Sequence, residues 1–390
     1  MSTQSLTDQY LAHTYARTPV TFVRGSGSLL WDETGREYID LGSGIAVNGL
    51  GLADEGWAAA VAAQAGALAH TSNLYYTEPQ ALLAETLCTR AGLQTVFFSN
   101  SGAEANECMI KTARKWAAHR WGEAARPGIV TLLGSFHGRT MATLSATGQT
   151  HYHETFGPFL PGFYHAVPGD LSSLRSVLAE QKGALCAVMI ELIQGEGGVL
   201  DLSPAYVWDL AALCAEENLL LLVDEVQTGN GRTGTLFAYE QYGIEPDIVS
   251  TAKGLAGGLP LGATLFGPRT AGVLTPGSHG STFGGNPVCA AAANYVLSRL
   301  DEALLSSVRQ KSAFLRARLA RAPGVRRVTG LGLMVGIETD RPAAEIQAAC
   351  LAQGLLVLTA KDRLRLLPAL TVPDALLARA TEILCAAIAG

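Results

Sequence analysis

The stretch NLLLLVDEVQTG at residues 218–229, together with DIVSTAKG at residues 247–254, decides the fold. The first stretch begins with the apolar run Leu219–Val223, which is too short for a helix and is typical of a parallel strand buried on both faces. The second begins with a similar run that predicts a neighbouring strand. Because open α/β sheets bind ligands beyond the carboxyl ends of their strands, we expect Asp224 and Lys253 to face one crevice.

An acid and a lysine at strand ends can form a plain ion pair, which is the simpler interpretation of Asp224 and Lys253 taken alone. Their surroundings favour a pyridoxal phosphate site. Asp224 follows an apolar run, so its charge is desolvated unless a partner balances it, and the glycines after Lys253 allow a ligand to approach the backbone. In such a site the lysine forms a Schiff base and the aspartate partners the pyridinium nitrogen. At about 4 Å and an effective dielectric constant of about 20, this carboxylate contributes about 4 kcal/mol to the protonated ring.

Composition limits the class of protein. A chain of 390 residues suggests about two or three domains, and hydrophobic residues at 48% against charged residues at 16% fit a large α/β core. The net charge of −6 without a basic block argues against a nucleic-acid partner. The 7 cysteines form no C-x-x-C pair, which indicates buried thiols in a reducing compartment. The first residues do not contain the apolar core of a signal peptide, and no apolar run in the sequence is long enough to span a membrane. We therefore expect a cytoplasmic protein without membrane contact.

Short strands and helices follow one another along the first part of the chain. Strand signals at residues 20–23, 29–31 and 38–41 predict a hairpin-type amino-terminal arm. An alanine-rich helix is expected at residues 57–69, and another at 79–91 that stops at Gly92. Further elements are a helix at 208–218 and strands at 96–98, 128–133, 184–190 and 261–266, the last as an antiparallel edge strand.

The last hundred residues predict a second α/β unit. Asn286 and Pro287 are a good N-cap and first residue for a long helix that extends to about Val308. The unit itself begins near residue 310. Its expected elements are helices at 312–321, 343–353 and 374–389 and strands at 325–330, 333–338, 355–358 and 364–368.

The segment SNSGAEAN at residues 99–106 follows a predicted strand and opens a helix that we expect to reach about Trp121. A Ser-Gly-Ala turn at this place can hold a phosphate, because backbone N–H groups and the helix dipole point at the anion. Taken alone, an asparagine or serine here is better explained as an ordinary helix N-cap. With Asp224 and Lys253 downstream, the turn favours phosphate binding.

Other motifs do not support other chemistries. Residues 229–234 spell G-x-G-x-x-G, but no long helix opens there and the next acids come too early for a dinucleotide site, so we interpret the match as chance. The sequence has no Gly-Lys dipeptide of a P-loop and no G-x-S-x-G hydrolase elbow. His151 and His153 lack further ligands nearby, so we predict no metal site.

Residues 224–234 (DEVQTGxGRTG) and 252–263 (AKGLxGGxPxGA) closely resemble the class III, or ω-amino, pyridoxal phosphate aminotransferases, and within them the acetylornithine aminotransferases. The resemblance extends over nearly the whole chain; one departure is Leu192, where the family usually has proline. It implies pyridoxal phosphate fold type I, with a large mixed-sheet α/β domain and a smaller carboxy-terminal α/β domain. The expected division is an arm at 1–50 that is part of the small domain, a cofactor-binding domain at 51–285, and a linking helix with the small domain at 286–390.

The resemblance implies the residues of a cofactor site. Lys253 and Asp224 would be catalytic, holding the cofactor and keeping its ring protonated. Phe136 would stack on one face of the ring and Val226 would pack on the other. Thr282 matches a residue that reaches the phosphate of a neighbouring subunit, which implies a homodimer with a shared site. The remaining cofactor contacts would come from Ser101, Gly102 and Ala103 at the phosphate, Gln227 at the ring hydroxyl, and His137, although a lone histidine is more often structural.

The resemblance also implies a substrate site. Arg139 matches a clamp for the distal carboxylate of the substrate, a task that suits the two-pronged guanidinium. Glu191 would lie near the substrate amine. Arg365, which needs a partner within its apolar strand, would bind the α-carboxylate of glutamate and otherwise pair with Glu196. Gly44 stands where ornithine aminotransferases have a tyrosine, and the missing ring would leave room for an N-acyl group.

The predicted function is therefore transfer of the δ-amine of N2-acetylornithine to 2-oxoglutarate, which gives N-acetylglutamate 5-semialdehyde and glutamate in arginine biosynthesis. Alternatives with the same chemistry use succinylornithine, acyl- or carrier-linked lysine, ornithine or 4-aminobutyrate as donor. Alternatives from other classes are a nicotinamide oxidoreductase and a non-catalytic dimeric module.

Overall fold

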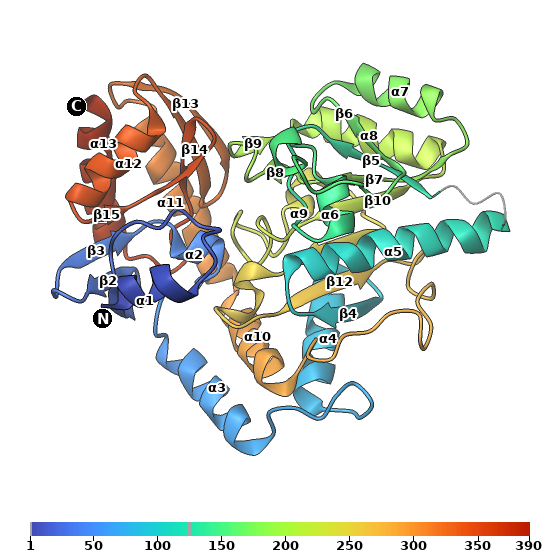
Figure 1. Ribbon diagram of the computed structural model, residues 1–390, viewed down its shortest axis with the longest axis horizontal. Coiled ribbons are helices and arrows are strands. Elements are labelled where there is room, and N and C mark those ends of the chain that lie inside the picture. The colour runs from blue at the N-terminus through green and yellow to red at the C-terminus, as the bar shows by residue number, and fades with distance from the viewer. Residues whose placement is uncertain (1, 123–126) are drawn as a thin grey trace.

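The structure is a computed structural model that describes residues 2–122 and 127–390. Within these residues the largest sheet has seven strands in the order β4-β12-β11-β10-β7-β5-β6 (Figure 1). Their bounds are β4 Thr95–Ser99, β12 Gly262–Phe266, β11 Ile248–Thr251, β10 Leu220–Asp224, β7 Leu185–Ile190, β5 Gly128–Leu132 and β6 Phe163–Ala166. Strand β10 runs parallel to both β7 and β11 and is buried along its length, so the predicted buried parallel strand is confirmed.

Both faces of β10 are covered, which explains its unbroken apolar sequence. Leu220 and Leu222 pack into one cluster with residues of α5 (Gly102–Trp121). Leu221 and Val223 point to the opposite face, where they join a cluster that includes residues of α8 (Pro204–Glu216). Figure 1 shows α5 and α8 on opposite sides of the sheet. Burying each of these side chains stabilises the fold by about 1.5–3 kcal/mol.

The other helices around this sheet lie on its flanks. Helix α10 (Pro287–Arg299) packs against α3 (Glu55–Ala67) and α4 (Glu78–Ala91) at the lower edge of Figure 1. Helix α4 ends at Gly92, whose φ of +66° is the left-handed conformation that glycine adopts easily, as expected for a helix stop. Shorter helices are α1 Thr3–Tyr10, α2 Ser43–Ala46, α6 Met141–Ala146, α7 Leu171–Glu180 and α9 Tyr239–Tyr242.

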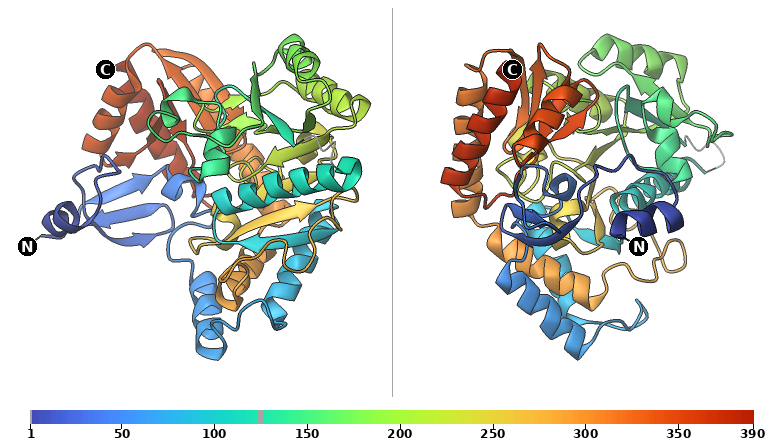
Figure 2. Two further views of the ribbon diagram at one scale, coloured as in Figure 1. Left: turned by 45° about the vertical axis from the view of Figure 1, so that its right-hand side comes forward. Right: turned by 60° about the vertical axis from the view of Figure 1, so that its left-hand side comes forward.

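The amino-terminal arm pairs with the carboxy-terminal part of the chain. Strand β15 (Leu355–Leu356) lies parallel to β3 (Glu37–Asp40), next to β2 (Leu29–Asp32) and β1 (Phe22–Ser26). Figure 2 shows the blue arm beside the red carboxy-terminal elements. The carboxy-terminal sheet has the order β13-β14-β17-β16, and the pair β8 and β9 lies between the two parts. The division of the chain at residues 50 and 285 stays a prediction.

The remaining bounds complete the second α/β unit. Its helices are α11 Glu302–Leu319, α12 Ala343–Ala352 and α13 Asp374–Ala389, and its strands are β13 Val325–Leu331, β14 Met334–Thr339, β16 Leu358–Ala360 and β17 Arg363–Leu366. The two-residue strands are β8 Ile193–Gln194 and β9 Leu200–Asp201.

Three details differ from the sequence prediction. The strand at 261–266 is antiparallel but not at the edge, because β4, from far upstream, pairs along its outer side. The helix predicted to run from Asn286 to Val308 ends at Arg299, because the carboxylate of Asp301 accepts the N–H of Leu304 and starts α11. The strand predicted at 355–358 is divided between two sheets, as β15 and β16.

None of the described helices combines the length with the apolar character that crossing a bilayer requires.

Candidate active site

Asp224 and Lys253 line the same cavity, as expected from their places at the carboxyl ends of adjacent strands. Asp224 is the last residue of β10, and Lys253 opens the short 3-10 helix η3 (Lys253–Ala256) just after β11. The cavity has a volume of about 270 Å³. Most of the other predicted site residues line it as well: Gly102, Ala103, Phe136, His137, Arg139, Glu191, Glu196, Val226 and Gln227.

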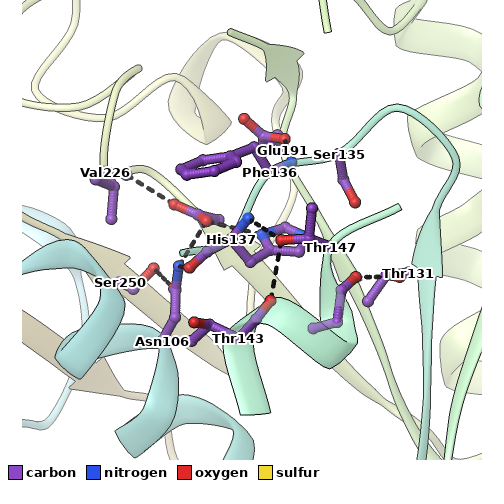
Figure 3. Close-up of polar contacts among 12 residues, drawn as sticks. Asn106, Thr131, Ser135, Phe136, His137, Thr143, Thr147, Glu191, Val226 and Ser250 are labelled. Atoms are coloured by element: carbon purple, nitrogen blue, oxygen red, sulfur yellow. Dashed lines mark hydrogen bonds and ion pairs between the residues drawn. The ribbon is translucent and has the colours of Figure 1, made fainter. Parts of the chain in front are cut away.

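The carboxylate of Asp224 is buried among three hydrogen-bond donors. The residues that supply these donors, Asn106, His137 and Val226, are labelled in Figure 3. Oδ2 of Asp224 accepts from Nδ2 of Asn106 and from Nδ1 of His137, both at 2.8 Å, and its Oδ1 accepts from the N–H of Val226 at 3.0 Å. An ionised carboxylate has no proton to give, so the hydrogen of the histidine contact lies on Nδ1. Together these donors offset the cost of removing the charge from water.

Asn106 is the residue of this network that the sequence prediction left without a role. It lies inside α5, where its Oδ1 accepts from the hydroxyl of Ser250 at 2.6 Å. That contact turns its Nδ2 toward Asp224 and toward the carbonyl oxygen of His137. The sequence does contain a signal for this role. Asn106 is a polar residue with low helix propensity in a helix just after the phosphate turn, and such a residue is better explained by a buried hydrogen bond than by a surface position.

Lys253 is a partly buried amine on a strained backbone. Its φ is +45°, a left-handed conformation that costs a non-glycine residue about 1–2 kcal/mol. Removal from bulk water lowers the pKa of Lys253, although the nearby carboxylates of Glu196 and Asp224 act in the opposite direction. Loss of the proton leaves a neutral amine, which is the nucleophilic form.

The start of α5 forms one wall of the cavity. The hydroxyl of Ser101 accepts the N–H of Glu104 at 3.2 Å, so Ser101 acts as the helix N-cap. The first-turn N–H groups of Gly102 and Ala103 have no partner within the helix, and together with the helix dipole they favour an anion. A Cβ atom on Gly102 would lie 2.6 Å from Cγ1 of Val226, so any larger residue at this wall would force Val226 to move.

Glu191 connects two loops that border the cavity. Its Oε2 accepts the N–H of Phe136 at 2.8 Å and its Oε1 accepts the N–H of Gly195 at 3.3 Å. Burial raises the pKa of Glu191 to about 7, although the nearby His137 lowers it. Phe136 and the loop that carries Glu196 are therefore held in place by one side chain.

Arg365, on the carboxy-terminal sheet, contacts two residues that line the cavity, Glu196 and Gln227. It lies on β17 and is buried, and its Nη1 is 2.5 Å from Oε1 of Glu196 and 3.4 Å from Oε1 of Gln227. Its Nε has no hydrogen-bond partner within residues 2–122 and 127–390. A buried guanidinium that is held by a partly exposed carboxylate can exchange that partner for a ligand carboxylate.

Comparison with known proteins identifies the family. The family model described as aminotransferase class-III matches residues 10–388. The chain belongs to the class-III aminotransferases. Enzymes of this family depend on pyridoxal phosphate, and the fold type I architecture expected from the sequence is confirmed.

Several relatives of this class-III aminotransferase cover it almost completely. The acetylornithine aminotransferase of Haemophilus ducreyi is 49% identical over 383 residues, which cover 98% of this chain and 97% of that protein. The N-acetylornithine aminotransferase structure from Stenotrophomonas maltophilia has a TM-score of 0.86 at 39% identity, covering 99% of this chain and 98% of the other. The ornithine aminotransferase structure from Toxoplasma gondii has a TM-score of 0.93 at 31% identity, and the match covers 99% of this chain and 94% of the other.

Four predicted site residues of this class-III aminotransferase do not line the cavity of Lys253, and one of them, Arg365, is connected to it through Glu196 and Gln227. Ser101 is directed into its capping bond. Gly44, with φ +62°, lines a separate cavity beside Asp40 and Leu358. Thr282 lies near Asn286 in another hollow. Because the family resemblance implies that Thr282 serves the site of a second copy of the chain, its role stays a prediction.

Glu225 follows Asp224 directly but points into the core. It is fully buried, its Oε2 accepts from the hydroxyl of Thr228 at 2.5 Å, and its Oε1 accepts the N–H of Tyr239 at 2.8 Å. Burial raises the pKa of Glu225 from 4.5 to about 7. The strand thus ends in two acids, one of which faces the cavity while the other faces the packed interior.

The raised pKa of Glu225 predicts a pH-dependent stability. Between about pH 4.5 and pH 7 the folded protein holds a proton on Glu225 that the unfolded chain has lost, so this residue's contribution to the free energy of unfolding falls as pH rises. Glu225→Gln should remove this fall. From pH 5 to pH 8 the variant should gain stability relative to wild type, by at most about 3 kcal/mol, as measured by urea unfolding.

Glu216→Gln, on the exposed surface of α8, is the matched control and should follow the wild-type curve. A wild-type minus Glu225→Gln difference that stays constant across this pH range would contradict the account.

Proposed function

We propose that this class-III aminotransferase moves the δ-amino group of N2-acetylornithine to 2-oxoglutarate with pyridoxal phosphate as cofactor. The observation that carries the proposal is the single cavity in which Lys253, the buried carboxylate of Asp224 and the start of α5 meet. The donor follows from relatives named acetylornithine aminotransferase, which are 43% to 49% identical over nearly the full chain.

The cavity fits the cofactor at three points. The N–H groups of Gly102 and Ala103 would hold the phosphate at a wall where a Cβ atom on Gly102 would displace Val226. Asp224, oriented by its three donors, would meet the ring nitrogen. Lys253 would hold the cofactor covalently. When bound, pyridoxal phosphate supplies an electron sink that stabilises negative charge on the carbon next to the reacting nitrogen.

The chain's own residues would do the remaining work. Burial favours the neutral form of Lys253. Once the substrate amine has taken its place on the cofactor, Lys253 would remove a proton from the δ-carbon of the substrate and deliver it to the cofactor carbon that is bonded to the reacting nitrogen. Phe136 and Val226 would enclose the ring from opposite faces, and Gln227 would hydrogen-bond its hydroxyl. His137 would act on the cofactor through Asp224, to which its Nδ1 is bound.

Selection of the donor would depend on groups at the cavity's opening. Arg139 would bind the carboxylate of N2-acetylornithine, and Glu191 would lie near the amine that reacts. Gly44 lines a separate cavity beside Asp40 and Leu358, and by the family resemblance the absence of a side chain there would leave space for the acetyl group. The supporting observation for Arg139 is that it lines the cavity while remaining exposed.

Arg365 and Glu196 would allow one site to accept two substrates. With N2-acetylornithine bound, Glu196 neutralises Arg365 through the ion pair already present. With glutamate bound, Glu196 moves away and Arg365 binds the α-carboxylate. The partly exposed carboxylate of Glu196 beside the buried guanidinium supports this exchange, because the acid can return to solvent at low cost.

A homodimer would complete the site through Thr282. The loop that carries Thr282 lies beside residues 70–76, where Nδ2 of Asn73 donates to the carbonyl oxygen of Gly284. Three large apolar side chains around this contact are strongly exposed: Leu74 at 85%, Tyr76 at 105% and Phe283 at 60%. A patch of this kind favours burial against a second copy. The unpaired thiols of the chain support a cytoplasmic location.

Rates with a panel of amine donors test the proposed function. N2-acetylornithine should give a kcat/KM at least about tenfold above that of ornithine, lysine or 4-aminobutyrate, because only it presents both the carboxylate and the acyl group to the cavity. Gly44→Tyr should lower the value for N2-acetylornithine, whereas Gly44→Ala, which shares the backbone strain at φ +62°, should lower it less. Equal rates for all donors would contradict the proposal.

Half-reactions test the exchange at Arg365. Arg365→Ala should slow the glutamate half-reaction by about 100-fold or more, since it removes a charge-assisted contact worth about 3 kcal/mol. The N2-acetylornithine half-reaction should change by less than about fivefold. Single-turnover absorbance measurements separate the two.

Arg365→Lys is the matched control for this test, because it keeps the positive charge but lacks the planar guanidinium. Its rate in the glutamate half-reaction should lie between those of wild type and Arg365→Ala. Equal losses in both half-reactions would show that Arg365 does not distinguish the two substrates.

A further inference from the structure

The side chain of Arg139 stands at the opening of the cavity without an acidic partner. It lines the cavity that contains Lys253 and is exposed to solvent. Over residues 2–122 and 127–390, no carboxylate forms an ion pair with it and no side chain or backbone group hydrogen-bonds it. An arginine side chain that is free to rotate loses about 2 kcal/mol of conformational freedom when a ligand fixes it. A binding role is therefore easier if something else already restrains the guanidinium.

Two aromatic rings provide this restraint. The Cζ atom of Arg139 lies 4.8 Å from the centre of the Tyr152 ring and 5.7 Å from that of Phe136. The two rings also contact each other, with centres 5.3 Å apart. Attraction between a cation and a ring needs none of the guanidinium's hydrogen-bond donors, so these donors stay available for a carboxylate.

The turn that carries Tyr152 is fastened to the loop that carries Arg139. The N–H of Gly134 donates to the carbonyl oxygen of Gly148 at 2.8 Å, and the N–H of Gly148 donates to Oγ of Ser135 at 3.0 Å. The side-chain amide of Gln149 donates to the carbonyl oxygen of Ser135 at 3.2 Å. Because these bonds fix one segment on the other, the ring of Tyr152 keeps its place relative to Arg139.

We propose that Tyr152 is a positioning residue that holds Arg139 over the cavity's opening and thereby selects donors with a carboxylate distant from the reacting amine. This inference rests on the proposed function, in which Arg139 binds the carboxylate of N2-acetylornithine. Tyr152 does not line the cavity and acts through Arg139. Its ring, not its hydroxyl group, does the holding.

Two amine substrates, N2-acetylornithine and N-acetylputrescine, distinguish a positioning role of Tyr152 from a general structural role. N-Acetylputrescine is N2-acetylornithine without the carboxylate. Tyr152→Leu should lower kcat/KM for N2-acetylornithine about two- to fivefold, mainly through a higher KM, the size expected for an exposed contact between a cation and a ring. It should leave kcat/KM for N-acetylputrescine unchanged. Equal losses with both donors would overturn the inference, because they would indicate a structural role.

Two further variants sharpen the comparison. Tyr152→Phe keeps the ring and should match wild type with both donors. In an Arg139→Gln background, Tyr152→Leu should have no further effect on N2-acetylornithine, because the partner is already missing. A Tyr152→Phe enzyme as impaired as Tyr152→Leu, or an additive loss in the double variant, would overturn the inference.

A binding measurement separates this inference from the proposed function. N-Acetylnorvaline keeps the acetyl and carboxylate groups of the donor and has no amine to react. By calorimetry with the holoenzyme, its Kd should rise about two- to fivefold in Tyr152→Leu and not in Tyr152→Phe. An unchanged Kd, or no binding to wild type, overturns the inference. Normal binding without turnover of N2-acetylornithine would overturn only the proposed function.

Discussion

A charged carboxylate can remain in a protein interior only when donors surround it, and the burial of Asp224 imposes this condition on the whole fold. Its donors come from three separate places: Asn106 on α5, His137 after β5, and the backbone at the end of β10 itself. Each hydrogen bond to a charged group contributes about 1.5–3 kcal/mol to stability, and losing one leaves part of the buried charge without compensation. The sheet order and the position of α5 must therefore both be correct before the site exists.

The same sheet order brings the other chemical groups to the cavity. Parallel strands end on one side of a sheet, so Lys253, just after β11, lies at the same cavity as Asp224, the last residue of β10. The start of α5 adds an anion-binding wall, and Arg365 arrives from a different sheet, where it pairs with Glu196. The cavity thus combines an amine, a buried acid, free backbone N–H groups and cations that suit carboxylates. These are the groups that an enzyme acting on amino acids and oxo acids needs.

Sequence reasoning predicted what depends on local patterns and missed what depends on distant partners. The apolar run before Asp224 and the glycines after Lys253 are local, so the strand ends and their shared crevice could be expected. The role of Asn106 could not, because its partners lie on other elements. The strand at 261–266 resembled an edge strand because β4, its outer neighbour, is far away in sequence. The break before α11 depends on one capping carboxylate, Asp301, inside a stretch whose apolar pattern continues on both sides.

The account depends most on Lys253 being the residue that holds the cofactor beside Asp224. Reduction of the pyridoxal phosphate-loaded protein with borohydride, followed by peptide mass spectrometry, identifies the lysine to which the cofactor is attached. The account predicts the cofactor's mass on the peptide that contains Lys253, and a Lys253→Ala protein that carries no label and lacks the visible absorbance of the bound cofactor. A label on a different lysine, or an unlabelled wild-type protein that still catalyses transamination, would contradict it.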